Sequence, residues 1–141
     1  MMLSVFTRLL GGILLVSIVT IEAGGLFLLQ MLRGAEASYV ANPLRQSLFR
    51  AGHAHAGVLV ILSLVIQIYV DRLRLPMFLE LIARLGVPCA AILMPLGLFL
   101  SVASPRAERP NGLIVLTYLG GASLALGVLA LGIALLWSVA V

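Results

Sequence analysis

Four long apolar segments predict an all-α, polytopic membrane protein, folded as an antiparallel bundle of four transmembrane helices. Of the 141 residues, 62% are hydrophobic and only 10% are charged, whereas soluble domains contain about 45–50% apolar and about 25% charged residues. The segments cover residues 9–32, 51–70, 81–103 and 113–138, and crossing the hydrocarbon core takes about 20 apolar residues. A chain of this length is one domain, so we expect a single four-helix domain over residues 1–141.

The first segment is predicted to be a membrane helix that stays in the protein. Ala35-Glu36-Ala37 resembles a signal-peptide cleavage site, but the apolar run before it is too long for a signal peptide and contains Glu22. Leu, Ala and Gly without period-2 alternation favour helices over barrel strands in all four segments.

The second helix is predicted to begin before its apolar part. Asn42-Pro43 is a good helix start, because Asn caps an N-terminus and Pro suits the first helical position. Residues 51–70 would then be preceded by an amphipathic first turn or two with Arg45 and Arg50 on the surface.

The third segment has two further features. Glu80 and Arg84 lie four residues apart, which predicts an ion pair on one helix face. Pro88 and Pro95 should kink the helix or free backbone carbonyls. The connection that follows, residues 104–111, contains two prolines and three charged residues and is predicted to be an exposed turn.

Small residues form a stripe on the fourth segment: Gly120, Ser123, Gly127, Ala130 and Ala134. Such a stripe lets another helix approach closely. Two interpretations remain open: packing within the chain, or a contact with a second copy or a larger membrane complex through the Gly120/Ser123/Gly127 face.

All nine basic residues are Arg, and they are scattered beside apolar runs, where arginines anchor helix ends and meet lipid phosphates. We therefore expect the lipid bilayer as a partner and no nucleic acid. The arginine-only usage is typical of a high-GC bacterial genome, which places the protein in the plasma (inner) membrane. Because the arginines divide almost evenly between the two sides, the positive-inside rule discriminates little. We expect both termini in the cytoplasm.

The candidate functional residues are Glu22, His53 and His55, since ionisable residues within membrane helices are costly and commonly functional. Glu22 lies about 21 Å along a helix from Arg8, and His55 about 24 Å from Asp71. In antiparallel neighbouring helices these distances place the three side chains at similar depth. We therefore expect Glu22 to approach one of the histidines.

The histidine spacing limits what this site can bind. Residues two apart on a helix point about 200° from each other, so His53 and His55 cannot easily hold one ion together. Arg50 lies one turn before His53 and would suit an anionic group such as a propionate or lipid phosphate.

The segment Arg50-Ala-Gly-His53-Ala-His55-Ala-Gly57 resembles the His-x-His helices of heme-copper oxidase catalytic subunits and their small relatives. It is also similar to small actinobacterial membrane proteins with a Gly-His-Ala-His-Ala-Gly string, which imply no function. The first resemblance covers about fifteen residues and implies an axial heme ligand at His53 or His55. The chain departs from those subunits in having only two histidines, so it implies a single ligand or a heme shared between subunits.

Three functions remain open. The first is a heme- or transition-metal-binding membrane protein of a respiratory complex, with His53, His55 and Glu22 as ligands and Arg50 nearby. The second is a noncatalytic accessory subunit, in which Glu22 only fixes helix register with His53 or Arg50. The third is a proton-coupled transporter or channel. The sequence contains no nucleophilic triad, phosphate loop or CxxC motif, so it predicts no ordinary enzyme.

Overall fold

The protein is all-helical. A computed structural model describes residues 3–140, with side chains to residue 139. The helices in chain order are α1 (Val5–Gln30), the π-helical turn η1 (Met31–Ala35), α2 (Ala37–Val40), α3 (Pro43–Val70), α4 (Met77–Leu100), the 3-10 turn η2 (Gly112–Ile114) and α5 (Val115–Ala140). Four of these segments are long and apolar enough to cross a membrane.

Local chemistry explains where the long helices begin. The Ser4 hydroxyl caps α1 by accepting from the Thr7 N–H. Asn42 caps α3 by accepting from the Arg45 N–H, with Pro43 in the first turn, which confirms the predicted start of the second helix. The first and third helices begin earlier than their apolar runs, and α4 ends at Leu100 rather than residue 103. At Gly34 a φ of 94° ends the first helical segment, a conformation that suits glycine.

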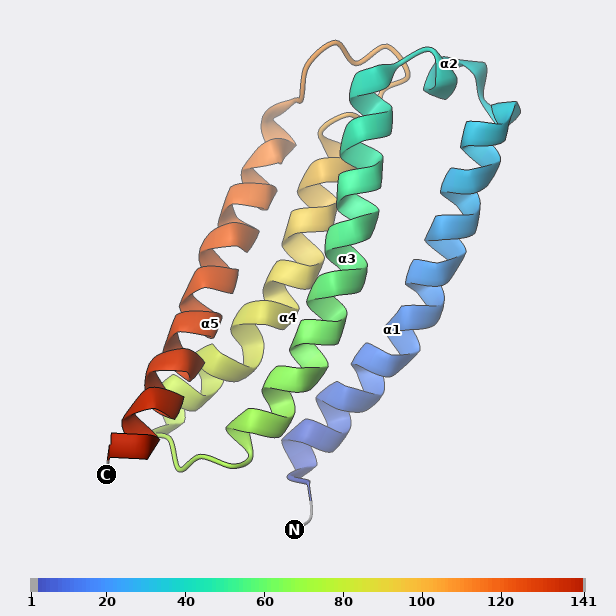
Figure 1. The fold of residues 1–141 in the computed structure, drawn as a ribbon. Coiled ribbons are helices and arrows are strands. Elements are labelled where there is room, and N and C mark those ends of the chain that lie inside the picture. The colour runs from blue at the N-terminus through green and yellow to red at the C-terminus, as the bar shows by residue number, and fades with distance from the viewer. Residues whose placement is uncertain (1–2, 141) are drawn as a thin grey trace.

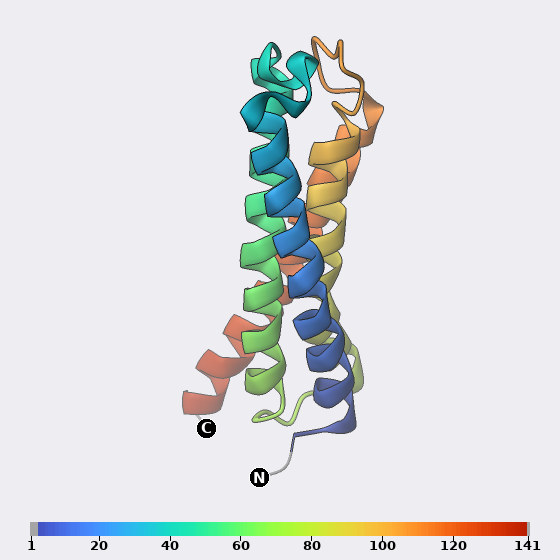
Figure 2. The same ribbon diagram turned by 90° about the vertical axis from the view of Figure 1, so that its right-hand side faces the viewer.

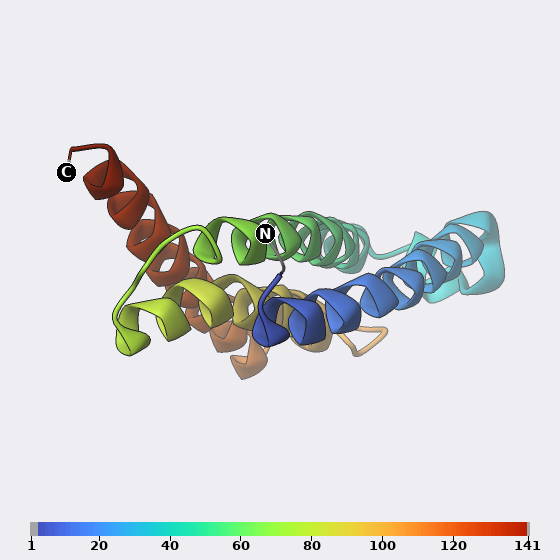
Figure 3. The same cartoon turned by 90° about the horizontal axis from the view of Figure 1, so that it is seen from below.

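Successive long helices run in opposite directions, and both chain ends lie at the same end of the molecule (Figure 1). Within the described residues, α1 packs on α3, α3 packs on α4, and α4 packs on α5, while the backbones of α1 and α5 do not meet. Seen from the side and from below, the C-terminal end of α5 turns away from α1 (Figures 2 and 3). The helices therefore form an open row with α1 at one edge.

The small-residue stripe of α5 packs against α4 of the same chain. A Cβ added at Gly127 would lie 3.0 Å from the Gly86 Cα, and one added at Gly120 would lie 2.5 Å from the Met94 Cγ. The Ser123 hydroxyl donates to the Gly86 carbonyl at 2.8 Å. The Gly120/Ser123/Gly127 face is thus filled within the chain, so a partner would have to use another surface.

The prolines of α4 leave the helix continuous but free a carbonyl, as predicted. Pro88 has no N–H to give to the Arg84 carbonyl one turn earlier. The side-chain amide of Gln67 on α3 donates to that carbonyl instead, at 2.8 Å. Apolar contacts complete the packing around this region, with Leu59, Val70, Val87 and Leu131 among the buried residues that α3, α4 and α5 share.

Candidate functional site

His53 lies against α1, at the level that the sequence predicted. A Cβ added at Gly25 would come within 3.1 Å of His53 Nε2, and one at Gly24 within 3.9 Å of Nδ1. The glycines after Glu22 therefore leave room for the imidazole. Matched depth between this part of α1 and His53 is what the distances from Arg8 and Asp71 predicted.

Glu22 makes no bond to His53 in the described part of the chain. Glu22 is exposed, and among the described residues no hydrogen bond or ion pair links it to His53, His55 or Arg50. Gly25 and Gly24 lie nearest His53. Glu22 points about 60° from Gly25 and about 200° from Gly24, on the exposed flank of this contact. A direct hydrogen bond or ion pair is thus absent among the described residues, and the expectation that Glu22 approaches one of the histidines stays a prediction.

His55 is held by its own helix. Its Nδ1 lies 2.7 Å from the Ala51 carbonyl oxygen. Because a carbonyl can only accept, Nδ1 carries the proton in this contact, and in the neutral ring Nε2 keeps a free lone pair. His55 is half-buried, and its helix neighbour Gly52 is covered by the ring of Phe99 on α4.

The two histidines do not form a shared metal site. Within the described residues no group of three or more His, Cys, Asp or Glu side chains could hold a metal ion. His53 and His55 lie two residues apart on α3 and point about 200° from each other. Glu22 and Arg50 are exposed, and within the described residues neither is bonded to a histidine. The residues present do not fit a metal with several protein ligands or a heme with both axial ligands from one chain.

One of two clusters of buried polar and charged side chains lies near the end of the molecule where α1 begins and α5 ends. Arg84 on α4 donates to Asp71 at 2.6 Å, to Glu80 and the Thr7 hydroxyl at 2.8 Å, and to the Gln67 side-chain oxygen at 3.2 Å. Only 3% of Arg84 is exposed. We call these five residues the Arg84 network. It joins α1, α3 and α4 and includes the Glu80–Arg84 pair that the sequence predicted.

Asp71 also ties the start of α1 to the end of α3, because its carboxylate accepts from the Ser4 N–H at 2.9 Å. Burial by itself raises the pKa of Asp71. The hydrogen bonds from Arg84 and Ser4 outweigh burial and lower the pKa to about 2. Asp71 is therefore a carboxylate at physiological pH, which suits its position beside a buried guanidinium.

A second network lies at the opposite end, around Arg45. The guanidinium donates to Glu36 at 2.9 Å and to the Val102 carbonyl at 3.2 Å, and it lies 5.2 Å from the centre of the Phe49 ring. Arg45 is only 4% exposed, so its expected place on an amphipathic surface is wrong. A hydrogen bond from Ser38, and then one from Arg45, lowers the pKa of Glu36.

Sequence reasoning missed most of both networks. Thr7, Gln67 and Asp71 are far apart in the chain, and neither Thr nor Gln in an apolar run identifies its partner. One signal was available: Pro88 frees the Arg84 carbonyl, which calls for a donor from a neighbouring helix.

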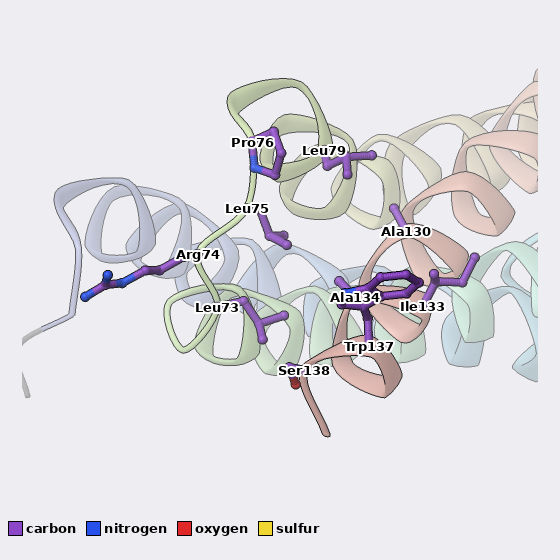
Figure 4. A pocket seen from close by; sticks show the side chains of 10 residues that line it. All are labelled: Leu73, Arg74, Leu75, Pro76, Leu79, Ala130, Ile133, Ala134, Trp137 and Ser138. Atoms are coloured by element: carbon purple, nitrogen blue, oxygen red, sulfur yellow. The ribbon is translucent and has the colours of Figure 1, made fainter. Parts of the chain in front are cut away.

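A cavity of about 630 Å³ lies at the same end of the molecule as the Arg84 network, between the α3–α4 connection and the end of α5 (Figure 4). Leu75, Leu79, Ile133 and Trp137 are among its mostly apolar lining residues, and Arg74 points away from the others. Neither histidine nor Glu22 lines it. Its apolar walls suit hydrocarbon rather than a polar substrate.

Comparisons of the chain with protein-family models, with curated proteins and with solved structures found no match.

Proposed function

We propose that this chain is a multi-pass protein of the plasma membrane that acts as a noncatalytic subunit, joining a membrane assembly through the outer face of α1. One observation carries the proposal: Glu22, the ionisable residue in the middle of α1, is exposed and has no partner within the described chain. In lipid such a side chain is costly unless a neighbour satisfies it. In the proposed assembly, another subunit provides that neighbour.

The four long helices support membrane insertion. The four spans are 24 to 31 residues long, and the most apolar stretch within each has a mean hydropathy of 1.8 to 2.2. A helix of 24 residues is about 36 Å long, which exceeds the roughly 30 Å hydrocarbon core. The connections at the helix ends carry arginines that can reach lipid phosphates. With both termini in the cytoplasm, residues 33–42 and 101–111 lie outside.

The uneven coverage of the helices supports assembly through α1. Only 11% of the most apolar stretch of α1 is buried, against 44% for α4. The ends of α1 are nevertheless held: Thr7 takes part in the Arg84 network, and Leu28 and Met31 pack in a cluster with Tyr39 and Phe49. A helix that is fixed at both ends and exposed along its outer face presents a defined surface for another helix.

Site-specific photocrosslinking in native membranes tests the proposal. A photoreactive residue replaces Leu26 on α1 or, as the matched control, Ile61 on α3; both side chains are 59% exposed. We expect protein adducts from position 26 and only lipid adducts from position 61. Equal crosslinking from both positions, or none from position 26, would contradict assembly through α1.

A single-ligand heme or metal site at His55 is the second candidate. The fixed Nδ1 contact with Ala51 favours it, because it orients the ring and leaves Nε2 available. Metal-ligating histidines are commonly held by such a hydrogen bond from the other ring nitrogen. The protein purified in mild detergent from its own host should then show a Soret band or stoichiometric metal. That signal should disappear in His55→Ala and persist in His53→Ala. A colourless, metal-free wild-type protein would eliminate this candidate and leave the subunit proposal intact.

A further inference from the structure

Glu22 belongs to a continuous exposed stripe along α1. Residues spaced alternately three and four apart face one side of a helix in the manner of coiled-coil seams. The stripe, which we call the α1 stripe, consists of Gly12, Leu15, Val19, Glu22, Leu26 and Leu29, all exposed. Its spacing allows a second helix to pack at a shallow left-handed crossing, and Gly12 lets the helices come close at one end.

Glu22 lies near the middle of the membrane-spanning length of α1. It is 14 residues from Arg8 and 11 from Arg33, which is about 21 Å and about 16 Å along the helix. Both arginines are exposed and can sit at the two membrane surfaces. The carboxyl group is therefore far from either membrane surface. A glutamate side chain is too short to extend its charged group to water, as arginine side chains near helix ends do.

The nearby polar groups of the chain do not satisfy Glu22. The only other polar side chain in the middle of α1 with comparable exposure, Thr20, already donates to the Ser17 carbonyl at 2.7 Å. The remaining exposed charged side chains of the described residues lie toward the helix ends and connections: Arg8, Arg33, Arg50, Arg72, Arg74, Arg106, Glu108 and Arg109. In a second copy of this chain, the exposed ionisable group at the depth of Glu22 is Glu22 itself.

A two-fold axis along the membrane normal places the same residues of two copies opposite each other at equal depth. A carboxylic acid group donates through its O–H and accepts through its carbonyl oxygen, so two glutamic acid side chains can hydrogen-bond each other across the axis. A helix of another protein would carry a polar group at the depth of Glu22 only by chance. In a second copy of this chain, symmetry places one there.

We propose that the protein is a homodimer in which the α1 stripes of two copies pack together and the two Glu22 side chains hydrogen-bond at the centre of the interface. This inference rests on the proposed assembly through α1 and names its partner as a second copy. One hydrogen bond between membrane helices contributes about 0.6–2 kcal/mol, which corresponds to about a 3- to 30-fold change in dimer dissociation constant.

The test measures dimerisation of the full-length chain in liposomes by energy transfer between donor- and acceptor-labelled copies as the lipid-to-protein ratio varies. Glu22→Leu should weaken the dimer about 3- to 30-fold. Glu22→Gln, which keeps a donor and an acceptor without charge, should retain it. Thr20→Ala is the matched control on the opposite face of α1 and should leave dimerisation unchanged. Because Glu22 and Thr20 are both exposed, all three variants should keep the helix content and melting temperature of the wild type.

Disulfide trapping locates the interface in the same liposomes, with Cys89 replaced by Ser. Single cysteines at Val19 or Leu26 should form dimers under mild oxidation, and a cysteine at Ile13, which is exposed but points away from the α1 stripe, should not. Equal dimerisation by wild type and Glu22→Leu would overturn the inference. A wild-type monomer whose position 26 crosslinks a different protein in native membranes would overturn it too, but would leave the proposed function standing. A monomer without such crosslinks would remove both.

Discussion

Gln67 illustrates, at the scale of single residues, how a polar side chain becomes necessary inside an apolar helix. Pro88 leaves the Arg84 carbonyl without its helical donor, and the Gln67 amide donates to it from the neighbouring helix. The oxygen of the same side chain accepts from the Arg84 guanidinium. One amide thus satisfies both ends of a buried arginine residue.

Removing that amide should lower the free energy of unfolding more in the wild type than in a chain without Pro88. We expect Gln67→Leu to lower the free energy of unfolding by about 1–3 kcal/mol, because it leaves buried polar groups unpaired. With Pro88→Ala, a backbone N–H at position 88 can reach the Arg84 carbonyl, so the cost of Gln67→Leu should fall. A double-mutant cycle by chemical denaturation in detergent measures the difference. An identical cost in both backgrounds would show that the proline does not create the need for Gln67.

Asp71 should make stability depend on pH in the acid range. Its pKa is about 2 in the folded protein, below the ordinary value of 3.8. The stability that this shift contributes is therefore complete above about pH 4 and is lost as pH falls through about 2. The contribution is at most about 2.5 kcal/mol, at about 1.4 kcal/mol per pKa unit.

Thermal melts in detergent between pH 5 and pH 2 measure this contribution. Asp71→Asn should be less stable than wild type at pH 5 and should lose less further stability on acidification. Glu108→Gln, at an exposed carboxylate in the 104–111 connection, is the control and should follow the wild type. A wild-type curve parallel to that of Asp71→Asn would show that the Arg84–Asp71 contact is not what protects the protein from acid.

At the scale of helices, the backbones of α4 and α5 come into direct contact at glycines. A Cβ added at Gly86 would lie 2.7 Å from the Gly127 Cα, so the two backbones touch. Gly121, on the same helix as Gly127, has nothing within 4 Å of an added Cβ. Gly127 therefore permits the close approach of α4, whereas Gly121 lies on a side of α5 where the space is open.

We expect Gly86→Ala to destabilise the protein by about 1–3 kcal/mol, because the added methyl group forces the two backbones apart. Gly121→Ala should be neutral or slightly stabilising, since alanine favours a helix and the space is open. Unfolding by denaturant in a single detergent compares the two variants. A loss from Gly121→Ala as large as that from Gly86→Ala would mean that helix propensity, not close approach, sets the effect.

At the scale of the whole molecule, the alternating helix directions place residues 31–42 and 101–111 at one end and residues 71–76 at the other (Figure 1). In a chain with Cys89 replaced by Ser, single cysteines at Ala35 and Ser104 should react with an impermeant maleimide on intact cells. One at Arg74 should react only after permeabilisation. Labelling of Ala35 and Ser104 from opposite sides would contradict a four-span topology, whereas complete inversion would contradict only the cytoplasmic placement of the termini.

The sequence by itself determined the helices and some of their ends. Run length and composition identify four helices of membrane-crossing length, and Asn42-Pro43 marks the start of α3 because capping is a local interaction. It also determined the depth at which His53 meets α1, since rise per residue is constant along a helix. The Glu80–Arg84 pair was predictable for the same reason, as its geometry is internal to one helix.

Only the tertiary structure decided which face of each helix meets a neighbour. Rotation of a helix about its axis depends on packing across helices, which apolar runs of Leu, Ala and Gly hardly specify because nearly every face is apolar. That rotation turns Glu22 outward while Gly24 and Gly25 meet His53, buries Arg45 against Val102, and brings Thr7, Gln67 and Asp71 to Arg84. The sequence located the polar residues along the helix axes, and the packing of the helices decided which of them are satisfied inside the chain.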